Sequence, residues 1–209
     1  AEHFAAIVME YVEGSSLDRY IKRRGTKTPN VAKMAALFGQ ILDGIAHAHQ
    51  MEIIHRDIKP GNILLEASGD EITPKITDFG IAKILTESRH TETGTTMGTV
   101  HYAAPEQLTD AKSVDHRADI YSLGCTFYEM LTANVPFDGD TVYAIMKRHI
   151  EAPRPDAQSL NANVPRGLVN LIKRAMSIDP GMRFSTVKEM KVELLDAVER
   201  ARATRTQRA

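Results

Sequence analysis

The chain has 209 residues, 43% of them hydrophobic, and a formal net charge of −1 at pH 7. This length fits one domain or a large lobe, and the near-neutral charge implies no nucleic acid or other strong polyelectrolyte as partner. No stretch of about 18 apolar residues exists, so no membrane-spanning segment is expected. The single cysteine, Cys125, cannot form an internal disulfide, which suits a reducing compartment.

The first residues predict a strand followed by a short helix. The apolar run at residues 4–11 is typical of a buried strand, and Gly14-Ser15-Ser16 is expected to end it. Ser15 or Ser16 can then cap a short helix that continues through Arg24, with Gly25 as its stop.

The next segment predicts a long helix and a hairpin. Apolar residues recur with helical spacing from residue 29 or 30 to residue 50. Two strand-like segments, residues 63–65 and 75–77, flank a turn at residues 67–70.

The second half of the chain predicts a long loop followed by helices. Residues 81–104 are rich in Thr and Gly without periodicity, and a loop of this length in a compact domain is usually functional. The four arginines between Arg200 and Arg208 are expected to form a solvated, frayed tail. The predicted helices are 118–131, which is apolar on nearly every side, 141–150, 166–177 and 186–200.

Two motifs carry the chemistry. Residues 55–62 read His-Arg-Asp-Ile-Lys-Pro-Gly-Asn, and Asp78-Phe79-Gly80 follows after a short interval. Together they supply a carboxylate to position a hydroxyl nucleophile, a lysine to meet a phosphate, and amide and carboxylate oxygens for Mg²⁺. These groups are sufficient for one side of a phosphoryl transfer.

Both motifs resemble those of the protein kinase family. The resemblance implies that Asp57 accepts or orients the substrate hydroxyl proton, and that Lys59 neutralises charge on the transferring phosphoryl group. It implies that Asn62 and Asp78 hold Mg²⁺ and that ATP is the donor. Lys59 matches the Ser/Thr-specific pattern. His55 and Phe79 are expected to be packing residues.

Residues 78–106 resemble the family's activation segment, which ends at Ala104-Pro105-Glu106. Thr91 and Thr93 resemble the paired phosphosites of bacterial Hanks-type kinases, with Thr95 and Thr96 as competitors. A phosphate there would add about −2 charge, and Arg56 and Lys83 are the cations expected to receive it.

With further matches, the resemblance covers nearly the whole chain, from residue 4 to about residue 198, and it implies three supporting contacts. Thr99 is expected to bond the catalytic aspartate and lysine and to favour a Ser/Thr acceptor. Asp119 is expected to accept backbone N–H groups of the catalytic loop, because a buried charge needs such partners. Glu106 and Arg183 are expected to form a buried ion pair.

The nucleotide site is expected to be incomplete. No Gly-rich loop or strand lysine precedes Ile7-Val8-Met9-Glu10. The chain is therefore interpreted as a fragment that lacks its small lobe and is inactive alone. The resemblance implies nucleotide contacts from the residues that remain, with Met9 at the back of the adenine pocket: Met9, Glu10, Tyr11, Val12, Ser16 and Leu64.

The prediction as a whole is an α+β, protein-kinase-like fold: a mostly α large lobe with short strands and little of the small lobe. Residues 1–14 would be the last small-lobe strand and hinge, 15–200 the large lobe, and 201–209 a basic tail or linker. The function expected is a Ser/Thr protein kinase acting on protein hydroxyls, in the cytoplasm or as the cytoplasmic part of a membrane-anchored receptor.

Two alternatives remain open from the sequence. One is a non-catalytic lobe that binds peptides or a kinase partner. The other is a small-molecule phosphotransferase of similar fold, which Ala104-Pro105-Glu106 and Thr99 disfavour.

Overall fold

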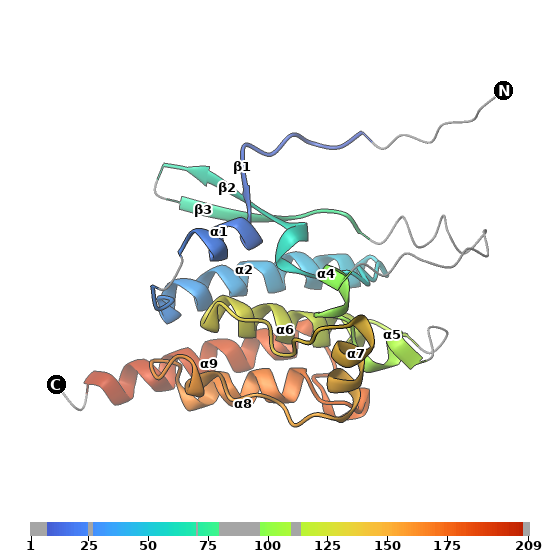
Figure 1. Ribbon diagram of the computed structural model, residues 1–209. Coiled ribbons are helices and arrows are strands. Elements are labelled where there is room, and N and C mark those ends of the chain that lie inside the picture. The colour runs from blue at the N-terminus through green and yellow to red at the C-terminus, as the bar shows by residue number, and fades with distance from the viewer. Residues whose placement is uncertain (1–7, 25–26, 70, 80–96, 110–113, 207–209) are drawn as a thin grey trace.

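The computed structural model describes residues 8–24, 27–69, 71–79, 97–109 and 114–206. A small antiparallel sheet lies on one side of a body of stacked helices (Figure 1). Below the sheet, in the view of Figure 1, come α1 and α2, then α6, and then α8 and α9. This is the α+β arrangement, mostly helical with a few short strands, that the sequence predicts.

The sheet has the strand order β1-β2-β3 and consists of Gly14–Ser16 (β1), Ile63–Ser68 (β2) and Glu71–Ile76 (β3). The prediction that residues 14–16 only interrupt a strand is wrong, because they pair with β2 themselves. Glycine is needed at the first position, since a Cβ on Gly14 would lie 2.0 Å from the carbonyl oxygen of Leu65. β2 and β3 are also longer than predicted and pair along their whole lengths.

Residues 8–13 precede this sheet and form no strand, which corrects the predicted strand over residues 4–11 where the structure describes it. Their side chains are exposed rather than buried: Val8 is 97% and Tyr11 88% exposed. A strand is stabilised by pairing, and among the described residues none pairs with this segment.

Two helices follow the predicted pattern closely. α1 spans Leu17–Arg23 and begins where the Ser16 hydroxyl accepts a hydrogen bond from the Arg19 amide. α2 spans Val31–Gln50 and begins where the Asn30 side chain accepts one from the Lys33 amide. α2 packs against β3, α6 and α9, so it connects the sheet to the helical body.

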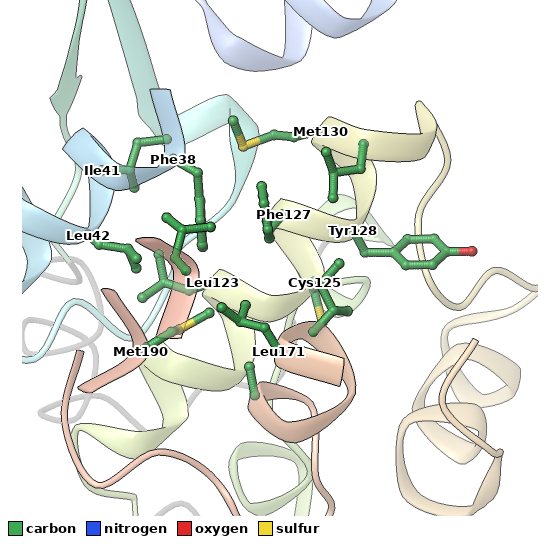
Figure 2. Close-up of a cluster of buried hydrophobic side chains, with 14 of the residues drawn as sticks. Phe38, Ile41, Leu42, Leu123, Cys125, Phe127, Tyr128, Met130, Leu171 and Met190 are labelled. Atoms are coloured by element: carbon green, nitrogen blue, oxygen red, sulfur yellow. The ribbon is translucent and has the colours of Figure 1, made fainter. Parts of the chain in front are cut away.

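The core is centred on α6, Arg117–Thr132, which is buried on almost every side. The ring of Phe38 on α2 stacks on Phe127 of α6, with centroids 4.1 Å apart and nearly parallel planes. Figure 2 shows side chains from α2, α6 and neighbouring helices converging on this stack, including Met190. Cys125 lies fully buried here, and burial raises the pKa of its thiol well above the usual range, so it acts as an apolar packing residue.

The remaining helices surround α6. Two short helices lie inside the segment predicted as a loop or just beyond it: α4, Met97–Val100, and α5, Pro105–Thr109. α7 spans Val142–Glu151, α8 Arg166–Ala175 and α9 Val187–Thr206.

α9 corrects the predicted end of the last helix and the predicted frayed tail. It continues past Arg200 to Thr206, because Ala and Arg are favourable helix residues. Among the described residues, no helix is long and apolar enough to cross a membrane.

Candidate active site

The candidate site is the loop that joins α2 to β2, residues 51–62. Its last residues form a 3₁₀ turn, Pro60–Asn62, that leads directly into β2. Arg56 has a left-handed backbone with φ = +64°, a conformation that is uncommon outside glycine. Such a backbone persists only where its surroundings hold it in place.

Asp119, in the first turn of α6, holds this loop. Its side chain is fully buried, and its Oδ1 accepts a hydrogen bond from the Arg56 amide at 2.8 Å. Oδ2 accepts from the His55 amide and from His49 Nε2, each at 2.8 Å. Three donors thus satisfy a carboxylate that would otherwise be costly to bury, and they fix the left-handed turn at Arg56.

Asp57, Lys59 and Asn62 converge at the centre of the loop. The Lys59 ammonium lies 2.8 Å from Asp57 Oδ2, and both side chains are 23% exposed. Asn62 Nδ2 donates to the Asp57 carbonyl oxygen at 2.8 Å and to Asp57 Oδ2 at 3.1 Å. The carboxylate of Asp57 is therefore oriented from two sides.

Thr99 completes this group from a distant part of the sequence. It lies on α4, and its Oγ1 accepts a hydrogen bond from the Lys59 ammonium at 2.9 Å. Lys59 thereby bridges Asp57 and Thr99, and of the two bonds that the family resemblance implies for Thr99 this is the one to the lysine.

His55 links the loop to the end of β3. Its ring is 1% exposed; Nε2 donates to the Thr77 carbonyl oxygen at 3.0 Å, and Nδ1 accepts from the Asp57 amide at 3.3 Å. The ring of Phe79 lies 4.7 Å from it. His55 and Phe79 are thus packing residues, as predicted, and His55 also ties Asp57 to the backbone just before Asp78.

Asn62 and Asp78 are the residues that fit a magnesium ion. Both Asn62 Nδ2 bonds go to Asp57, and within the described part of the chain its amide oxygen accepts none. The Asp78 side chain is exposed, on a left-handed backbone with φ = +57°. Carboxylate and amide oxygens are the hard donors that Mg²⁺ takes, usually completed by water and substrate phosphates. In keeping with this, the described residues hold no cluster of three or more His, Cys, Asp or Glu side chains that could bind a metal unaided.

The residues predicted to contact the nucleotide are spread across the sheet and the segment that precedes it. Met9 Sδ accepts a hydrogen bond from Thr77 Oγ1 at 3.8 Å, and the carboxylate of Glu10 pairs with the Lys75 ammonium. Ser16 and Leu64 are register partners of β1 and β2.

Tyr11 differs, since its side chain is 88% exposed, while Val12 is half-buried. The predicted contacts of residues 10–12 are made by their backbone groups, so the exposure of the Tyr11 side chain leaves that prediction open.

Glu106 and Arg183 form the ion pair that the sequence predicts. Arg183 Nη1 and Nη2 donate to Glu106 Oε1 and Oε2 at 2.6 and 2.7 Å, with Arg183 fully buried and Glu106 12% exposed. The guanidinium also donates to the carbonyl oxygens of Arg117, Ser177 and Ile178. All of its donor directions are used, so the buried charge is well compensated.

Two positioning residues were missed by sequence reasoning. His49 looks like part of the helical pattern of α2, and nothing nearby indicates its bond to Asp119. The Gln107 side chain donates to the Arg56 carbonyl oxygen at 2.9 Å and accepts from the Ala104 amide at 2.9 Å, so it links the start of α5 to the catalytic loop. Its only signal was its place directly after Ala104-Pro105-Glu106.

Three predicted regulatory residues, Thr91, Thr93 and Lys83, lie outside the described residues. Of that group, Arg56 alone is described, and its backbone is fixed by Asp119 and Gln107.

Comparison with known proteins gives one consistent result. Residues 1–195 match the family model of the protein kinase domain. The chain is 41% identical over 193 residues to the serine/threonine-protein kinase PrkC of Bacillus subtilis, covering 92% of this chain and 29% of that protein. It is 35% identical over 188 residues to PknL of Mycobacterium tuberculosis, covering 90% of this chain and 46% of that protein.

Solved structures agree. The PknI kinase domain of Mycobacterium tuberculosis matches with a TM-score of 0.69 at 22% identity, over 90% of this chain and 64% of that one, which shows the fold. Rad53 1–466 in complex with AMP-PNP also matches with a TM-score of 0.69, at 30% identity, over 88% of this chain and 44% of that one.

The catalytic loop brings Asp57, Lys59 and Asn62 together, and a buried helix, α6, holds it in place. This arrangement is typical of the protein kinases, and the chain belongs to that family. Its relatives place it among the serine/threonine protein kinases of the bacterial Hanks type. The chain spans less than half the length of the curated relatives it matches.

Proposed function

We propose that this chain supplies the large lobe of an enzyme that transfers the γ-phosphoryl group of ATP to Ser or Thr hydroxyls of proteins. The observation that carries the proposal is the Lys59 ammonium, which lies 2.8 Å from Asp57 and 2.9 Å from Thr99. Rad53, a relative in fold, was solved with AMP-PNP, and this supports a nucleotide as the donor here.

Each residue of the site has a separate role in the proposed phosphoryl transfer. Asp57 accepts a hydrogen bond from the incoming hydroxyl and orients its oxygen toward the phosphorus. Lys59 neutralises negative charge on the phosphoryl oxygens while it holds Asp57 and Thr99 in place. Asn62 and Asp78 would hold Mg²⁺, which would neutralise charge on the nucleotide phosphates.

In the same proposal, residues 1–14 belong to the end of the small lobe and the hinge, and the large lobe runs from residue 15 through α9. Met9, Glu10, Tyr11, Val12, Ser16 and Leu64 contribute to the adenine site. The small lobe is the partner that completes it, and the enzyme acts in the cytoplasm.

Regulation by phosphorylation is the second part of the proposal. A phosphate on Thr91 or Thr93 would be received by Arg56 and Lys83. Arg56 suits this role because the bonds to its amide and carbonyl fix its backbone directly beside Asp57. A phosphate at that point would order the activation segment against the catalytic loop.

The test uses a form of the chain that carries a kinase small lobe ahead of residue 1. Asp57→Asn should lower kcat by about 10²–10⁴-fold with nearly unchanged nucleotide affinity, because it removes hydroxyl positioning alone. Asp78→Asn should also weaken Mg²⁺-dependent nucleotide binding. Steady-state kinetics and nucleotide titrations at varied Mg²⁺ separate the two effects.

Asp196→Asn is the matched control, since that aspartate is exposed on α9, which contributes no residue to the proposed site. It should leave both readouts unchanged. If Asp57→Asn were as active as the unaltered chain, the assigned role would be refuted, and the alternative of a non-catalytic lobe that binds a partner would gain support.

A further inference from the structure

A cavity of about 480 Å³ lies on the side of the lobe where α2 ends and where α6 and α9 begin. Its lining includes Ala46, His49, Ile54, His116, Val187 and Lys188. These residues belong to segments far apart in the sequence that the stacked helices of Figure 1 bring together. None of them is proposed to contact the substrate or the nucleotide, although His49 positions the catalytic loop through Asp119. The volume is within the range of about 300–1,000 Å³ usual for small-molecule sites.

Two imidazole rings form one wall of this cavity. The rings of His49 and His116 meet edge to face, with centroids 5.6 Å apart. His49 Nε2 is bonded to Asp119 Oδ2, and His116 Nε2 to the Ser185 carbonyl oxygen, each at 2.8 Å. Because a carboxylate and a carbonyl oxygen only accept hydrogen bonds, each Nε2 carries the proton.

The other nitrogen of each ring is left as an acceptor. In a neutral imidazole with a protonated Nε2, Nδ1 has a free lone pair. Within the described part of the chain, neither Nδ1 makes a hydrogen bond. A ligand that fits this wall therefore brings an N–H or O–H donor.

The remaining lining indicates a flat and uncharged ligand. Ala46, Ile54 and Val187 supply apolar contacts, while Gln50 and Thr186 are polar, uncharged and exposed. The charged lining residues, Glu52 and Lys188, are exposed and opposite in sign, so they select for no net charge. A planar aromatic ring fits between apolar side chains and imidazole edges.

We propose that this cavity binds a small neutral aromatic molecule that carries a hydroxyl or N–H donor, of the phenol or indole class, and that its binding is transmitted to the catalytic loop. The route is short. A ligand donor bonded to His49 Nδ1 polarises the ring, whose Nε2–H is bonded to Asp119 Oδ2. The same carboxylate holds the amides of His55 and Arg56.

The experiment is an amide NMR titration of the 209-residue chain with phenol, indole and toluene. Toluene matches phenol in size and lacks the donor. Phenol and indole should give saturable shifts at Ala46 and Val187, and also at His55 and Arg56. Toluene should bind at least fivefold more weakly. The proposal does not rest on kinase activity, so binding is read without turnover.

Two variants locate the site. Ala46→Leu fills the cavity and should weaken phenol binding at least tenfold, whereas Ala36→Leu adds the same atoms at an exposed position of α2 and should change nothing. His116→Phe keeps a ring but removes an acceptor, and should reduce phenol toward the affinity of toluene. Circular dichroism verifies that each variant is folded.

Several results would overturn the proposal. Shifts that do not saturate, toluene binding as tightly as phenol, or unchanged phenol binding in both folded variants would each exclude the site. Shifts at Ala46 and Val187 without any at His55 and Arg56 would exclude the coupling to the catalytic loop.

Discussion

At the scale of single residues, the Glu106–Arg183 pair gives the sharpest prediction on stability. Either Glu106→Gln or Arg183→Met should lower the free energy of unfolding by about 3–5 kcal/mol, because each leaves a buried partner without its counter-charge. Arg183→Met also removes the hydrogen bonds that the guanidinium donates to three backbone carbonyl oxygens. Urea unfolding monitored by circular dichroism measures the loss.

Arg200→Met is the matched control for this pair. Arg200 pairs with Glu193 at 2.9 Å, but both side chains are largely exposed, so its loss should stay within about 1 kcal/mol. Equal losses for Arg183→Met and Arg200→Met would show that burial of the pair does not matter.

The residues of the site were more predictable than their connections. Asp57, Lys59 and Asn62 could be selected because their residue types and order carry chemistry, and Thr99 because the family resemblance implies its role. The structure links all four through hydrogen bonds of Asp57 and Lys59. The bonds from His49 to Asp119 and from Gln107 to Arg56 could not be predicted. They join segments 70 and 51 residues apart, and no local pattern records such a contact.

At the scale of elements, α7 is attached to α6 through a buried histidine, and this makes its docking sensitive to pH. His149 on α7 is fully buried, its Nδ1 bonded to the Tyr121 hydroxyl on α6 at 2.8 Å. Burial, followed by the positive charge of Arg154, lowers the pKa of His149 to about 3 from its ordinary value of 6.5. The unfolded chain therefore binds a proton in a range where the folded chain does not.

The lowered pKa of His149 sets the direction in which the free energy of unfolding changes with pH. Because the folded pKa is lowered, the stabilisation is complete above about pH 6.5 and is lost as pH falls from there toward about 3. The free energy of unfolding should drop by about 1.4 kcal/mol for each pH unit below that point. Urea unfolding at pH 7.5, 6.5 and 5.5 measures the slope.

Two variants test whether His149 causes the dependence of the free energy of unfolding on pH. His149→Gln should flatten it, whatever its effect on stability at pH 7.5, while His47→Gln removes an exposed histidine of α2 and should leave it unchanged. An unaltered slope in folded His149→Gln would mean that other groups cause the dependence.

Elements with strong periodicity or clear caps were predicted well, and those that depend on pairing were not. Asn30 and Thr141 each cap the helix that the pattern indicated. Residues 4–11 have the composition of a strand, yet where they are described no neighbouring strand pairs with them. Residues 14–16 have the composition of a turn, yet β2 lies alongside and pairs with them. Pairing is a property of two segments, so neither sequence alone could show it.

At the scale of the whole molecule, the catalytic loop and the nucleotide site differ in how complete they are within these 209 residues. The loop is held from three directions, by α6, by the end of β3 and by α5. The residues predicted to form the hinge are, by contrast, largely exposed to solvent: Met9 is 61% and Tyr11 88% exposed. No Gly-rich loop or strand lysine lies ahead of Met9 in the sequence. Within these 209 residues, the catalytic loop is therefore fixed more firmly than the segment predicted to hold the nucleotide.

We therefore expect no appreciable kinase turnover from the 209-residue chain alone. Phosphoryl transfer depends on preorganised charges at both ends of the phosphate chain, and loss of such electrostatic stabilisation costs orders of magnitude in rate. Release of labelled phosphate from ATP, with and without a protein acceptor, measures this, and the form that carries a small lobe is the positive control. Turnover by the chain alone that disappears in Asp57→Asn would contradict the expectation. It would mean that Lys59, Asn62 and Asp78 suffice to position the nucleotide from the large-lobe side.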